Sequence, residues 1–192
     1  MNTTKRKIFE ISTKLFAQKG YDATSIEEIT SVVGVAKGTL YYHFNSKEEL
    51  FNQLIQDGID FLKKSIDIKT RKTETLVERL RKIIIIQIKV IKKFDDFMII
   101  IFSQLWGGSN RNELVRDNIN SYIDKIAQVI SNDNKLLDIA DAKIVANLMF
   151  GQLSSILMYE LDNGKDFDIE ELSNKYLEIL LKGIEKGNEY VN

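Results

Sequence analysis

The stretch SIEEITSVVGVAKGTLYYHFNSKEEL, residues 25–50, decides the fold of this chain. Ser25 and Glu28 have the spacing of a capping box, in which a hydroxyl and a carboxylate satisfy free amides at a helix start. Apolar residues follow at helical spacing, and Gly34 ends this helix after about two turns. A second short helix is expected at residues 36–44. Two short helices joined by a tight glycine turn predict a helix-turn-helix.

This arrangement is suited to DNA. The major groove of B-DNA admits one α-helix, and the helix that precedes it can brace against the phosphate backbone. Residues 25–33 are expected to brace, and residues 36–44 are expected to lie in the groove. A second capping box, Ser46 with Glu49, opens a further helix that should continue to about Lys64.

The N-terminal quarter of the chain resembles the TetR family of bacterial transcriptional regulators. The residues that carry the resemblance are Ile8, Leu15-Phe16, Gly20-Tyr21, Ala23-Thr24, Ile29, Gly34-Val35, Lys37 to Phe44, and Lys47 to Leu50, within the stretch from Ile8 to Phe51. Thr30 and Val33 stand where the family often has Ala, and Ala36 stands where Ser is common. Ala36 cannot cap the reading helix through its side chain. The resemblance implies an all-α fold and a DNA-binding regulator, with repression as the family norm.

The resemblance and side-chain chemistry together predict the DNA contacts. These are Ser25, Lys37, Gly38, Thr39, Tyr41, Tyr42, His43 and Lys47. The two lysines suit phosphate oxygens, and Tyr42 and His43 lie where the family commonly touches the DNA backbone. The free amides at the start of a helix suit a phosphate near Ser25, and the missing Cβ of Gly38 permits close approach.

Base reading is assigned to two residues. Thr39 and Tyr41 could reach base edges, and the Thr39 methyl could pack on a thymine methyl. Tyr41 could instead belong to the core, because Leu40 and Phe44 on the same short helix are core residues. His43 is the single histidine of the chain, so no second histidine and no cysteine joins it in a metal or catalytic site.

Composition excludes several classes of protein. The 192 residues include 44% hydrophobic and 29% charged residues, a balance typical of a globular protein. The absence of Pro favours an all-helical fold, and the absence of Cys excludes disulfides and thiolate metal sites and fits a reducing cytosol. The longest apolar runs, residues 83–86 and 97–102, are far shorter than the ~20 residues that cross a bilayer.

The net charge of −1 hides an asymmetry along the chain. Residues 1–47 carry seven basic and four acidic side chains, whereas residues 48–192 carry 20 basic and 24 acidic ones. A polyanion such as DNA should therefore meet the N-terminal part. We expect residues 1–47 to form the DNA-binding domain and residues 48–192 a helical ligand-binding and dimerisation domain, with about nine helices in all and residues 46–64 as the connecting helix.

The last two expected helices, residues 138–161 and 169–186, have the pattern of a dimer interface. The first combines small side chains with Ile and Leu, and the second carries a broad apolar stripe. The family habit of pairing these helices across a two-fold axis supports a homodimer, although an ordinary domain core would show the same pattern. The expected interface residues are Leu153, Leu157, Tyr176, Leu177, Leu180, Leu181 and Ile184.

Aromatic and methionine side chains are concentrated between residues 94 and 159. A mostly apolar pocket there would suit a small lipophilic effector that lowers operator affinity. The expected effector contacts are Phe97, Met98, Phe102, Trp106, Tyr122, Phe150, Met158 and Tyr159. The alternative is that these side chains form an ordinary core.

Other functions remain to be weighed against a DNA-binding regulator. An enzyme is not expected, because the chain shows no nucleophile–base pair, no phosphate loop and no metal cluster, and Asp95, Asp96 and Glu113 stand where helix caps belong. We expect no cofactor, no metal and no membrane partner. Double-stranded palindromic DNA, a second copy of the chain and an effector are the expected partners, in the cytoplasm. A regulator that responds to a protein partner instead of a small molecule is the second reading.

Overall fold

A computed structural model describes residues 3–72, 75–131, 138–163 and 167–187, with the side chains of residues 160–163 and 183–187 left aside. Within these residues the chain forms helices and no strand, as expected. The helices are α1 (Thr3–Lys19), α2 (Ile26–Val33), α3 (Lys37–His43), α4 (Lys47–Thr70), α5 (Leu76–Lys93), α6 (Asp95–Gln104), α7 (Asn110–Ser131), α8 (Ile139–Asn163) and α9 (Ile169–Gly187).

Helices α2 and α4 begin, and α2 ends, at the residues that the sequence predicts. The Ser25 hydroxyl accepts a hydrogen bond from the Glu28 amide at 3.1 Å, and the Ser46 hydroxyl accepts one from the Glu49 amide at 3.0 Å. Gly34 ends α2 with φ 79°, a left-handed conformation that glycine adopts without a Cβ penalty. Ala36 precedes α3 without a side-chain cap, as expected.

One predicted helix end was wrong. The helix α4 continues six residues past Lys64, because residues 65–70 contain no helix breaker and Ile66 is fully buried. The start of α7 is capped by Ser109. Ser109 and Asn112 exchange hydrogen bonds reciprocally, with Ser109 N to Asn112 Oδ1 at 3.2 Å and Asn112 N to Ser109 Oγ at 3.3 Å.

The chain divides into two compact units. Unit one comprises Met1–Phe61 and Phe94–Asn120, and unit two comprises Leu62–Lys93 and Ser121–Asn192. The long helices α4 and α7 each contribute residues to both units. Unit one therefore holds the expected DNA-binding residues together with α6 and the start of α7. The expected domain boundary after residue 47 stays a prediction.

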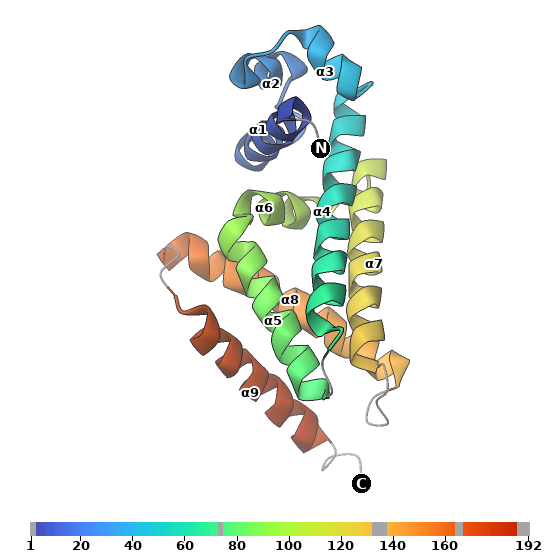
Figure 1. Cartoon of the computed structure of the whole chain (residues 1–192), viewed down its shortest axis with the longest axis vertical. Helices are drawn as coiled ribbons and strands as arrows, with labels where there is room; N and C mark the ends of the chain where they lie inside the picture. Colours follow the sequence, from blue (N-terminus) through green and yellow to red (C-terminus); the bar gives the residue numbers. More distant parts are fainter. Residues whose placement is uncertain (1–2, 73–74, 132–137, 164–166, 188–192) are drawn as a thin grey trace. The chain divides into compact units, whose positions relative to one another are not determined.

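Unit one is built around a three-helix head. Helix α1 packs against α2, α3 and α6, and α2 packs against α3 (Figure 1). The core of the head consists of Ile8, Phe16, Ile29, Leu40 and Phe44, each at most 3% exposed. This burial leaves the opposite sides of the short helices α2 and α3 facing solvent, which positions the candidate DNA-binding surface.

Unit two is organised around α5, which packs against α8 and α9 (Figure 1). Its interior is largely aliphatic, with Leu80, Ile83, Ile88, Ile91 and Ile126 fully buried. Inside this unit Gln87 donates a hydrogen bond to the Tyr122 hydroxyl at 3.3 Å, and both side chains are buried. Burial raises the pKa of the Tyr122 hydroxyl, and the hydrogen bond from Gln87 opposes that rise. No helix among the described residues is long and apolar enough to span a membrane.

Candidate DNA-binding surface

The reading helix α3 has one buried and one exposed side. Leu40 and Phe44 are at most 2% exposed, whereas Tyr42 is 84% and Tyr41 is 43% exposed. Lys37 and Gly38 are exposed, and Thr39 and His43 are half-buried. Tyr41 is therefore not part of the core, the alternative considered from the sequence. A Cβ added at Gly38 would meet nothing within 4 Å, so the backbone there is open to a ligand.

Lys37 is paired with Glu27, the second residue of α2. The hydrogen bond between the two side chains lowers the pKa of Glu27 and raises the pKa of Lys37. The cation that is predicted to bind a phosphate is thus paired with a carboxylate of the neighbouring helix. Glu27 is not among the residues expected from the sequence, although its spacing of ten residues from Lys37 across the glycine turn is visible there.

Lys47 is directed toward the body of unit one. Its ammonium group donates hydrogen bonds to the carbonyl oxygens of Tyr21 and Thr24 at 2.9 and 2.8 Å. It also lies 4.3 Å from the centroid of the Tyr21 ring. These contacts give Lys47 a structural role in tying the start of α4 to the turn between α1 and α2. Phosphate binding by Lys47 stays a prediction.

Ser25 and His43 lie at the two ends of the surface. The Ser25 hydroxyl is already used to cap α2, whose first turn carries Glu27 and Glu28. A phosphate at this end would therefore use the backbone amides of α2 and meet two carboxylates nearby. His43 stacks edge to face on Tyr42, with ring centroids 5.1 Å apart. Among the described residues no group of three His, Cys, Asp or Glu side chains could hold a metal ion.

The expected effector residues are not gathered around one cavity by the described structure. Phe97 and Met98 are buried in unit one, where Phe102 is half-buried and Trp106 is 89% exposed. Tyr122 and Phe150 are buried in unit two with ring centroids 6.4 Å apart, and Met158 and Tyr159 are 61% and 59% exposed there. Effector contact by these residues stays a prediction, and the exposure of Trp106 makes it a weak fluorescence probe of a buried ligand.

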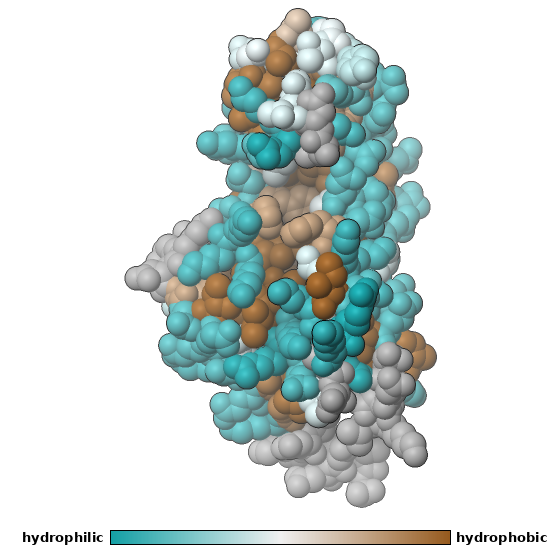
Figure 2. Space-filling view, viewed as in Figure 1, coloured by the Kyte–Doolittle hydropathy of each residue, from teal (hydrophilic) through white to brown (hydrophobic). Residues whose placement is uncertain are grey.

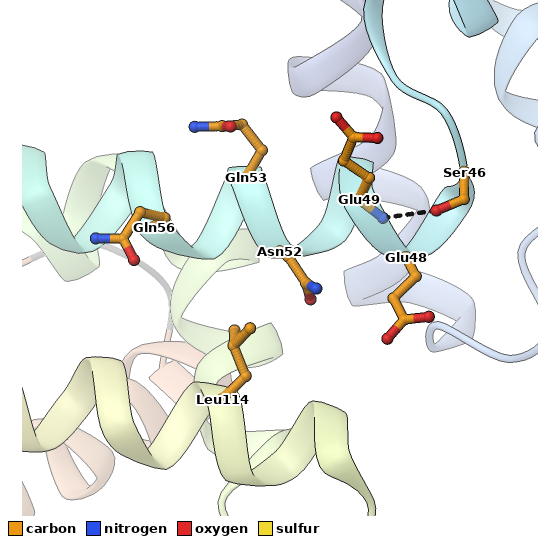
Figure 3. Close-up of a pocket in the computed structure, with 7 residues that line it drawn as sticks. All are labelled: Ser46, Glu48, Glu49, Asn52, Gln53, Gln56 and Leu114. Carbon is orange, nitrogen blue, oxygen red and sulfur yellow. Dashed lines mark hydrogen bonds between the residues drawn. The ribbon is translucent and has the colours of Figure 1, made fainter.

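A pocket of about 420 Å³ lies elsewhere, between α4 and α7 in unit one. Its lining is polar except for Leu114, and in Figure 3 Asn52 extends from α4 toward that leucine. The carboxylates of Glu48 and Glu49 point in opposite directions (Figure 3), and Glu49 accepts hydrogen bonds from Asn45. This pocket has neither the apolar lining for a lipophilic effector nor converging carboxylates for a cation.

The expected interface residues divide into two groups. Leu153, Leu157, Leu177 and Leu180 are 4–8% exposed and belong to the core of unit two, whereas Tyr176 and Leu181 are half-buried. The side chain of Ile184 lies outside the described residues. The apolar side chains that α8 and α9 expose include a different set: Ile144, Leu148, Met158, Tyr159 and Ile179, each 57–66% exposed. We call this set the outer face.

Comparison with known proteins places the head in a family. The family model described as bacterial regulatory proteins, tetR family, matches residues 8–54. The chain is 30% identical over 129 residues to the biofilm operon icaADBC HTH-type negative transcriptional regulator IcaR of Staphylococcus aureus. The match covers 67% of this chain and 66% of that regulator, so the chain spans just under two thirds of this relative's length.

Solved structures extend the similarity to the whole chain. A Clostridium perfringens protein assigned as a fatty acid metabolism regulator is 32% identical, with a TM-score of 0.84 over 92% of this chain and 97% of that one. FadR of Bacillus subtilis, solved in complex with stearoyl-CoA, shares the fold with a TM-score of 0.78 at 18% identity, over 93% and 98% of the two chains. This chain belongs to the TetR family of bacterial DNA-binding transcriptional regulators.

Proposed function

We propose that the chain is a homodimeric repressor that holds a two-fold-symmetric operator through α3 and is released by a fatty-acyl ligand. Residues 1–47 form the DNA-binding domain in this proposal, and residues 48–192 form the ligand-binding and dimerisation domain. The observation that carries DNA binding is the exposed surface of α3. Tyr42, which lies on a short helix braced by α2, is 84% exposed although it is a large aromatic residue.

The outer face supports the homodimer. Four of its members lie at helical spacing on one side of α8, and Ile179 lies on α9; exposed apolar side chains that gather in this way favour burial against a partner. In Figure 2 apolar side chains interrupt the hydrophilic surface around α5 and α8. Pairing of two copies about a two-fold axis would match the two-fold symmetry of a palindromic operator.

The choice of a fatty-acyl ligand rests on the relatives. The 32% identical C. perfringens protein is assigned to fatty acid metabolism, and the B. subtilis regulator with the same fold was solved with stearoyl-CoA. The aliphatic interior of unit two, with the buried polar contact between Gln87 and Tyr122, suits an acyl chain that carries a polar group. Such a repressor acts where its operator is, in the cytoplasm, and has no need of enzymatic activity.

The experiment is a binding titration of the full chain with fluorescent duplexes tiled across the DNA next to its gene. Palmitoyl-CoA is then added to the complex, with free palmitate and CoA as separate controls. We expect anisotropy to fall with palmitoyl-CoA, and a tenfold loss of operator affinity corresponds to a coupling of about 1.4 kcal/mol. Release by palmitate alone would mean that the protein recognises the acyl chain and does not need the CoA thioester. No release by any of the three would reject the fatty-acyl ligand.

A second reading, control by a protein partner, is favoured by one observation. Tyr122 and Phe150, two of the expected effector contacts, are 2% and 8% exposed because protein side chains cover them in the monomer. The same titration separates the readings, since a partner-controlled repressor would bind the operator and ignore all three small molecules.

A further inference from the structure

Arg111 occupies an unfavourable position for a cation. It is the second residue of α7, and the N-terminus of a helix already carries a partial positive charge. The side chain is nevertheless largely covered, with 20% of its surface exposed. Partners outside α7 must therefore compensate for the position.

Those partners come from two other segments of unit one. The guanidinium group lies 4.1 Å from the centroid of the Tyr21 ring and 3.2 Å from the Asp22 carboxylate, in the turn between α1 and α2. Its Nε also donates a hydrogen bond to the side-chain oxygen of Gln104, the last residue of α6, at 3.0 Å. Because guanidinium is planar with a fixed fork of donors, one group can stack on a ring and hold two acceptors.

Lys47, at the start of α4, also holds the turn between α1 and α2. Lys47 binds the Tyr21 and Thr24 carbonyls and lies over the Tyr21 ring, and it follows the last residue of α3 by only four positions. Phe51 of α4 also contacts the Tyr21 ring edge to face, with centroids 5.1 Å apart. The turn between α1 and α2 thus connects the start of α7 to the segment that follows the reading helix.

We propose that Arg111 is a positioning residue for DNA binding, which fixes the turn between α1 and α2, and with it α2 and α3, relative to the ends of α6 and α7. The proposal rests on operator binding through α3 but not on the identity of any effector. Helix α6 also packs directly on α1, so a displacement of α6 would change the contacts among Gln104, Arg111 and Asp22. Arg111 would then carry that displacement to α2 and α3.

The test compares Arg111→Gln with Arg116→Gln in the full chain. Both variants remove one positive charge from the first half of α7, but Arg116 donates only to the carbonyls of Leu105 and Gly107 in the connection between α6 and α7. Operator affinity is measured by anisotropy over a range of salt concentrations. We expect Arg111→Gln to weaken binding roughly 2- to 30-fold with no change in salt dependence, and Arg116→Gln to bind as the wild type does. Equal affinities for the two variants would overturn the proposal.

The salt dependence distinguishes positioning from direct phosphate contact. Loss of one phosphate contact lowers the slope of log affinity against log salt by about 0.9. If Arg111→Gln lowers that slope, Arg111 binds DNA itself and the proposal is wrong. The variant Tyr42→Ala is measured in parallel. If Arg111→Gln and Tyr42→Ala both leave operator affinity unchanged, DNA binding through α3 is itself wrong. If only Arg111→Gln leaves it unchanged, the proposal for Arg111 alone is wrong.

Asp22→Asn gives a second test, in which the fold should be retained because the Asp22 side chain is 85% exposed. Removing a negative charge should strengthen DNA binding if only long-range electrostatics act. Positioning through Arg111 predicts the opposite sign, a weaker complex. The double variant with Arg111→Gln should bind no more weakly than Arg111→Gln alone, because the two side chains share one contact. Tighter binding by Asp22→Asn would overturn the proposal.

Discussion

Glu27 and Lys37 form an ion pair that joins the first turns of α2 and α3 on the exposed side of the helix-turn-helix. A DNA phosphate that binds Lys37 must take the place of this carboxylate. The hydrogen bond from Lys37 lowers the pKa of Glu27, so the pair is intact at neutral pH. Glu27 therefore competes with a DNA phosphate for Lys37, one of the side chains expected to bind the DNA backbone.

Glu27→Gln should strengthen operator binding about two- to fivefold, since it frees Lys37 from a solvent-exposed pair. Glu28→Gln is the matched control, because it removes the same charge from the same turn but releases Lys19, which is not an expected DNA contact. Anisotropy titrations of both variants against one operator duplex provide the measurement. An equal gain for both would mean that general electrostatics, and not the release of Lys37, is responsible.

Tyr42→Ala should change the strength of DNA binding, whereas Thr39→Ala should change the base preference. Tyr42→Ala should weaken binding about tenfold or more to specific and nonspecific duplexes alike, since phosphate contacts carry no sequence information. Thr39→Ala should shift the preferred base at one position of each half-site. Selection from a randomised operator library measures both properties. A changed base preference for Tyr42→Ala, with none for Thr39→Ala, would reverse the two assignments.

Ile179→Glu should produce a folded monomer. Ile179 is 66% exposed on the outer face, so the new charge is solvated in one chain and desolvated only in a dimer. Leu180→Glu should instead unfold unit two, because Leu180 is 8% exposed in the single chain. Sedimentation equilibrium combined with circular dichroism separates the two results. Ile68→Glu, at a 57% exposed site on α4, is the control that should remain dimeric. A dimer retained by Ile179→Glu would exclude the outer face from the interface.

Gly58→Ala should destabilise the chain by about 1–3 kcal/mol, because the added Cβ would collide with the ring of Phe97 where α6 packs on α4. An alanine inside a helix is otherwise favoured over glycine by about 1 kcal/mol. Urea denaturation gives the free energy of unfolding. Phe97→Leu in the Gly58→Ala background should restore part of the loss, since the shorter side chain makes room for the methyl group. Gly151→Ala is the control, because nothing lies within 4 Å of the corresponding Cβ.

The sequence alone determined the helix-turn-helix. The start of α2 depends on Ser25 and the start of the following helix α4 on Ser46, whose hydroxyls bond amides three residues away. The turn between α2 and α3 depends on a left-handed Gly34. These interactions are local, so the order of residue types was sufficient to predict them. The all-α fold followed equally from apolar periodicity and from the absence of proline.

Only the tertiary structure decided which way particular side chains face. The side chains Lys47 and Arg111 turn toward partners 26 and 89 residues away, contacts that no local pattern contains. On α8 apolar residues occur nearly all round the helix, so the sequence could not show that Leu153 lies in the core while Leu148 faces out. Burial of a face depends on which neighbouring helix covers it, and that choice is made by the packing of the whole chain.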